Sequence, residues 1–72
     1  MIIAGLKQSK KAVEAGNVSR AYVAKDAQSE VVAPFLALCL RREVAVDCEY
    51  DMKELAKLCK VEVPTAVAVV TI

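Results

Sequence analysis

The chain has 72 residues, a net charge of +1 and a hydrophobic content of 57%, which fits one small folded domain over residues 1–72. Its longest apolar run, residues 31–40, is about half the length that a membrane crossing needs, so we expect no membrane partner.

The first half of the chain alternates short apolar runs with helical patterns. Met1–Ala4 predicts a strand, and Leu6–Ala15 predicts a helix that ends at Gly16. Arg20–Lys25 predicts a second strand. Glu30–Arg41 predicts a second helix, which is apolar around much of its circumference and is therefore expected to pack centrally.

The second half continues the same alternation. Val44–Val46 predicts a third strand. Met52–Cys59 predicts a third helix, because Asp51 as N-cap and Glu54 three residues later form a capping-box pattern. Thr65–Ile72 is too apolar to be half exposed, which predicts a strand in the middle of the sheet, covered on both faces.

Strict alternation of strand and helix predicts an α/β fold. We expect a three-layer α/β/α sandwich with helices on both faces of a four-stranded, mixed or largely parallel sheet. The connections are short, and no linker or repeat divides the chain.

The three cysteines, Cys39, Cys48 and Cys59, are widely spaced and odd in number, and the chain has no histidine. This pattern indicates neither a disulfide framework nor a metal site. Cys39 and Cys59 lie in apolar stretches, where a free thiol packs as a small hydrophobic group. Free thiols persist in a reducing compartment, which predicts a cytoplasmic location.

Residues suited to catalysis are scarce. Without histidine, the usual general base at neutral pH is missing. Carboxylate pairs such as Asp47 with Glu49 lie at the ends of elements, which is typical of solvated surface charge. We therefore expect no enzyme, no catalytic residue, no cofactor and no small-molecule substrate.

The most informative segment is residues 5–11, with the sequence Gly5-Leu6-Lys7-Gln8-Ser9-Lys10-Lys11. A helix start presents unpaired amides and a positive dipole end, so it favours anions. Cations crowded there are disfavoured by about 0.3–1 kcal/mol each, which points to an anionic partner such as nucleic-acid phosphate. The alternative is a solvated helix face.

Charge is unevenly distributed along the chain. Residues 1–25 carry five basic residues and one acidic residue, whereas residues 26–51 carry two basic and six acidic residues. A local basic patch, rather than the net charge, sets the electrostatic attraction for nucleic acid. With only three aromatic residues, the chain does not favour recognition that stacks bases on a sheet of aromatic rings.

Four blocks of sequence, 2–16, 22–27, 51–59 and 61–70, carry a family resemblance. Together they resemble the kink-turn-binding ribosomal-protein family of the L-seven-Ae and L-thirty-e type, and most of all its short bacterial relatives. The resemblance covers essentially the whole chain. It implies a three-layer α/β/α sandwich, in agreement with the alternation above.

The resemblance implies recognition of a kink-turn, a sharply bent RNA helix with tandem sheared G·A pairs and one extruded nucleotide. Carried over residue by residue, Gly5 allows close backbone approach, while Lys7 and Gln8 reach base edges and Lys11 contacts phosphate. The implied partner is structured RNA, with ribosomal RNA as one candidate, within a ribonucleoprotein or beside the ribosome.

A second segment is implied to complete the site. Val61, Glu62 and Val63 match the family's apolar loop that packs against the extruded base, and Val31 or Val32 is expected to close the other side.

The sequence departs from the family in two ways. Many members have Asn-Glu where this chain has Lys7-Gln8, which leaves the favoured base pairs open. The chain also begins at the first strand, so the first family helix is expected to be absent and part of one sheet face to be bare. The rival hypothesis is a protein-interaction module on the same fold, working through the acidic flank of Asp47, Glu49 and Asp51.

Overall fold

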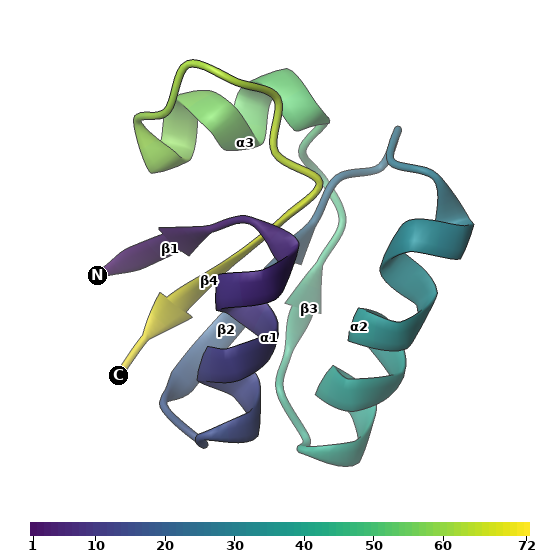
Figure 1. Ribbon diagram of the computed structural model, residues 1–72, viewed down its shortest axis with the longest axis vertical. Coiled ribbons are helices and arrows are strands. Elements are labelled where there is room, and N and C mark those ends of the chain that lie inside the picture. The colour runs from purple at the N-terminus through teal and green to yellow at the C-terminus, as the bar shows by residue number, and fades with distance from the viewer.

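The computed structural model describes all 72 residues and contains the expected four strands and three helices (Figure 1). In chain order they are β1 (Ile2–Ala4), α1 (Leu6–Glu14), β2 (Val18–Val23), α2 (Ser29–Arg41), β3 (Val46–Asp47), α3 (Met52–Cys59) and β4 (Val67–Thr71).

The strands form one mixed sheet in the order β1-β4-β2-β3. The last strand, β4, runs antiparallel to both neighbours, whereas β2 and β3 are parallel. Val67, Ala68 and Val69 of β4 are fully buried, so consecutive side chains on both faces are covered. The prediction that the last strand lies in the middle of the sheet is confirmed.

The helices cover the two faces unequally. α1 and α2 pack on one face, where residues from both helices, β2 and β4 form the main core: Val13, Val18, Ala21, Val23, Val32, Phe35, Cys39, Val67 and Val69. α3 lies across β1 and β4 on the opposite side from α1 (Figure 1). The predicted three-layer arrangement is therefore present, with a thinner third layer.

The sheet face on the side of α3 is only partly covered. Ile2, Val70 and Arg20 pair in register across β1, β4 and β2, so their side chains lie on one face. Ile2 remains 37% exposed, and Arg20 is exposed as well. Part of this face is bare, as the sequence predicted.

All three helices end in the same backbone motif. A residue with positive φ follows each helix: Gly16 at 76°, Glu43 at 58° and Lys60 at 59°. The N–H of the next residue donates to the carbonyl five residues earlier in each case, which is the Schellman arrangement.

This motif explains why one strand lies elsewhere than predicted. The third strand was expected at Val44–Val46, but β3 begins only at Val46. Val44 is not free to pair, because its N–H donates to the Cys39 carbonyl at 2.9 Å and closes α2. The second and fourth strands also differ from prediction by about two residues at their starts.

Candidate nucleic-acid interface

The sheet topology gathers four chain segments at one end of the molecule. Because β4 is antiparallel to β1 and β2, the residues that follow β1 and β2 lie beside the residues that precede β4. Two hydrogen bonds hold these segments together, from Gly5 N–H to the Val67 carbonyl at 3.0 Å and from Ala24 N–H to the Ala66 carbonyl at 2.8 Å. β3 is parallel to β2, so the segment that follows it also reaches this end, where Lys25 N–H donates to the Tyr50 carbonyl.

The start of α1 is an open helix N-terminus. Gly5 has φ 98° and ψ 146°, and no side chain caps the helix. Ser9 N–H makes the first intrahelical bond, to the Gly5 carbonyl at 3.0 Å, so the amides of residues 6–8 precede the helical ladder. A Cβ built at Gly5 meets no atom within 4 Å, which leaves the space above this turn open to a ligand.

The polar side chains predicted for this turn all face solvent. Lys7, Gln8 and Lys11 are exposed, and Lys7 and Lys11 lie four residues apart on one face of α1. The first turn contains no acidic residue, and neither lysine takes part in an ion pair. The cationic charge at this helix start is therefore uncompensated within the protein.

The loop before β4 is fixed at both ends and exposed between them. Val61 N–H donates to the Ala56 carbonyl at 3.0 Å, and Thr65 N–H donates to the Met52 carbonyl at 3.2 Å. Between these anchors Val63 is 67% exposed and Glu62 is also exposed. Val61 and Val63 therefore present apolar surface on a loop tied to α3.

A cavity of about 380 Å³ opens at the same end of the molecule. Val31 lines it and is 41% exposed, whereas Val32 is 5% exposed and belongs to the core, so only Val31 of the two predicted alternatives is available. The other lining residues come from three segments that the sequence alone did not connect: Asp26, Ala27, Gln28, Met52 and Ala66. The predicted loop residues 61–63 do not line this cavity.

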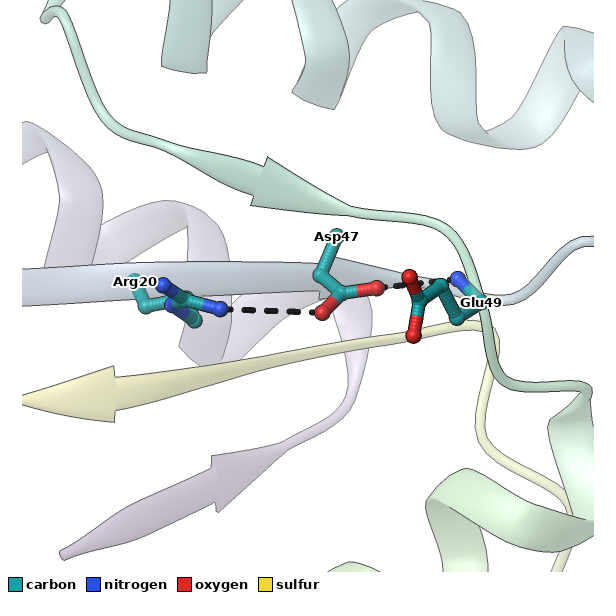
Figure 2. A network of polar contacts seen from close by, with 3 residues as sticks. All are labelled: Arg20, Asp47 and Glu49. Carbon is teal, nitrogen blue, oxygen red and sulfur yellow. Dashed lines mark hydrogen bonds and ion pairs between the residues drawn. The ribbon is translucent and has the colours of Figure 1, made fainter.

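The acidic flank is largely occupied by local structural bonds. Asp47 accepts a hydrogen bond from Glu49 N–H at 2.9 Å and pairs with Arg20, with Nη1 and Oδ2 3.6 Å apart (Figure 2). Asp51 accepts from Glu54 N–H at 2.7 Å as the N-cap of α3. Two of the three carboxylates in the rival hypothesis therefore already have partners within the chain.

The remaining reactive groups do not form a chemical site. Burial raises the pKa of the Cys39 and Cys59 thiols above the ordinary value, which disfavours the nucleophilic thiolate. No cluster of three potential metal ligands is present among the 72 residues. None of the helices combines the length and the apolar character that crossing a membrane would require.

Comparison with known proteins identifies the family of the chain. No known family profile matches the chain. The chain is 35% identical over 66 residues to the RNA-binding protein TTE2299 of Caldanaerobacter subterraneus subsp. tengcongensis, with 92% of this chain and 80% of that protein covered. The chain belongs to the L-seven-Ae-like RNA-binding family.

Solved structures agree with this L-seven-Ae-like assignment. The 15.5kD RNA binding protein of Giardia lamblia superposes with a TM-score of 0.88 at 28% identity, over 99% of this chain and 60% of that chain. A Bacillus halodurans protein of unknown function has a TM-score of 0.87 at 21% identity, over 99% of this chain and 71% of that chain, and shows the shared fold. This chain thus spans about three fifths of the Giardia protein.

Proposed function

We propose that this L-seven-Ae-like chain is an RNA-binding protein that recognises kink-turn RNA and has no catalytic role. The observation that carries the proposal is the bond between Gly5 and Val67, which brings an open cationic helix start beside the loop that precedes β4. At this end of the molecule, amide donors and lysine cations contact RNA phosphates and base edges. Apolar side chains contact the extruded base. The names of the relatives from Caldanaerobacter and Giardia support RNA as the partner.

Some exposed side chains of α1 contact the RNA backbone, and others contact the bases. Lys11 lies one turn into the helix and contacts phosphate. A phosphate contact fixes the position of the protein on the RNA and carries no sequence information. Lys7 and Gln8 donate to guanine edges of the sheared G·A pairs, and Gly5 leaves room for the RNA to approach the turn.

The extruded base is accommodated beside the loop of Val61, Glu62 and Val63. The cavity lined by Val31 also includes Ala66, which follows this loop in the chain, and has the size of a small-ligand site. We assign Val31 to the opposite wall of the base pocket. Placing an apolar base face against these side chains removes apolar surface from water, which is favourable by about 25 cal/mol per Å².

The cellular setting belongs to the same proposal. Kink-turns occur in structured RNAs, so we propose a role in a ribonucleoprotein, with ribosomal RNA as one target. The three thiols are free, which fits the reducing cytosol.

The test compares two substitutions in one titration series. Lys11→Ala should weaken binding to a kink-turn duplex and reduce the slope of log K against log salt by about 0.9, the value of one duplex phosphate contact. Gln8→Ala should instead narrow the difference in affinity between the kink-turn and a control duplex whose G·A pairs are replaced by Watson–Crick pairs. Calorimetric titration at several salt concentrations measures both effects.

Glu14→Ala is the control, because Glu14 is exposed near the far end of α1. It should leave discrimination between the two RNAs unchanged. Parent-like binding and discrimination by both Lys11→Ala and Gln8→Ala would show that the site is wrongly assigned.

A further inference from the structure

A second cavity, of about 330 Å³, shares Val61 and Glu62 with the loop assigned to the kink-turn and adds residues that this assignment does not use. It is formed by α3 and the segment that follows it, and its lining consists of Lys53, Ala56, Lys57, Val61, Glu62 and Pro64. Its volume is at the lower end of the range for small-ligand sites.

The lining combines two chemical features. Lys53 and Lys57 lie four residues apart on α3, so successive turns place both ammonium groups on one side of the cavity. Neither lysine pairs with a carboxylate, since the one ion pair in the structure is Arg20 with Asp47. Val61 and Pro64 supply apolar surface within the same cavity. Unpaired cations beside apolar side chains are complementary to a nucleotide, which has a charged phosphate and an apolar base face.

The cavity is a direct neighbour of the proposed base pocket. Met52 lines the first cavity and the next residue, Lys53, lines the second. Likewise Ala66 lines the first and Pro64 the second. Both cavities are therefore built on α3 and on the same segment before β4.

We propose that this second cavity binds a single-stranded nucleotide that flanks the kink-turn in the same RNA. The ammonium groups of Lys53 and Lys57 contact its phosphates, and its base lies against Val61 and Pro64. The Glu62 carboxylate is acceptor-only, so it selects a base that offers an exocyclic amino group, such as adenine, over uracil. The inference rests on the proposed kink-turn function and extends the site along one strand.

The experiment measures the affinity gained from a single-stranded extension. The parent protein is titrated with a blunt kink-turn duplex, and with the same duplex carrying a short adenosine or uridine extension at either strand end. The adenosine extension at one end should tighten binding by about tenfold at low salt and steepen the salt slope by about 1.4, as two single-strand phosphate contacts would. The uridine extension should give a smaller gain.

The variant K53Q/K57Q should bind the blunt duplex as the parent does and lose the gain from the extension. The matched control is R41Q/R42Q, which removes the same charge from the far end of α2, a helix of 13 residues and about 20 Å long. It should keep the gain. Far-ultraviolet circular dichroism and thermal unfolding verify that both variants fold.

Each alternative outcome has a defined meaning. Binding of the blunt duplex without any gain from either extension, or an equal loss in K53Q/K57Q and R41Q/R42Q, would overturn this inference and leave the proposed function standing. Absence of binding to every kink-turn RNA by the parent would overturn both. A dimer of the free protein that K53Q/K57Q dissociates would assign the cavity to a second copy of the chain and overturn the inference.

Discussion

At the scale of single residues, Gly5 is the position where backbone geometry restricts the amino acid most. Its φ of 98° with ψ of 146° lies in a region that residues with a Cβ rarely adopt. The turn allows the chain to pass from β1 into α1 within one residue while Gly5 N–H bonds to the Val67 carbonyl. The sequence predicted that a strand ends before Gly5 and a helix begins after it, but the bond that ties Gly5 to β4 could not be predicted from local pattern.

Gly5→Ala should lower the free energy of unfolding by about 1–3 kcal/mol through backbone strain alone. Steric clash is not involved, because the added Cβ would meet no atom within 4 Å. Gly16→Ala is the matched comparison, with φ of 76° and equally open space, and should cost about 1 kcal/mol, since it lies nearer the left-handed helical region. Urea unfolding measures both. Equal stability of Gly5→Ala and the parent would mean that the turn relaxes to negative φ.

At the scale of elements, helix starts and helix ends are encoded differently. The start of α3 follows from the sequence, because Asp51 and Glu54 form the predicted capping box with both hydrogen bonds present. The ends of α2 and α3 lie at Arg41 and Cys59, as predicted, although Glu43 and Lys60 occupy left-handed positions where glycine is usual. The Val44 N–H closes the end of α2 by bonding to the Cys39 carbonyl. For that reason the third strand starts two residues later than predicted.

Glu43→Gly should stabilise the protein by about 1 kcal/mol, because it removes the Cβ penalty at φ 58°. For a domain of this size, that corresponds to a rise in Tm of roughly 4–8 °C. Differential scanning calorimetry measures the change. Glu43→Ala removes the same charge but keeps a Cβ, so it should give no gain, and a gain equal to that of glycine would attribute the effect to charge.

At the scale of the whole molecule, the central strand β4 organises both the core and the candidate site. It pairs on both sides, with β1 and with β2, and three of its consecutive residues, Val67 to Val69, are fully buried. By contrast, β1 and β3 are edge strands of three and two residues. The same pairing places the segments after β1 and β2 beside the segment before β4, so the sheet itself assembles the proposed RNA-binding end.

Backbone amides of β4 should therefore exchange with solvent most slowly, followed by those of β2, and those of β1 and β3 fastest among the strands. Exchange from a central strand requires global unfolding, whereas short edges open locally. Hydrogen exchange followed by nuclear magnetic resonance gives the order directly. Slower exchange in β1 than in β4 would contradict the central role of β4, or would reveal a covered edge.

The sequence by itself determined the kinds of elements, their order, the mixed α/β class and the central position of the last strand. These follow from short-range periodicity, capping chemistry and the unbroken apolar run at residues 66–70, all of which are local properties. Its resemblance to the L-seven-Ae-like family was also present in the sequence and is confirmed.

Only the tertiary structure decided which residues share a surface. It placed Val31 rather than Val32 at a cavity, paired Asp47 with Arg20, and set Lys53 and Lys57 beside Val61. The physical reason is that such contacts depend on strand direction and register, which join segments tens of residues apart. Local sequence pattern does not specify them.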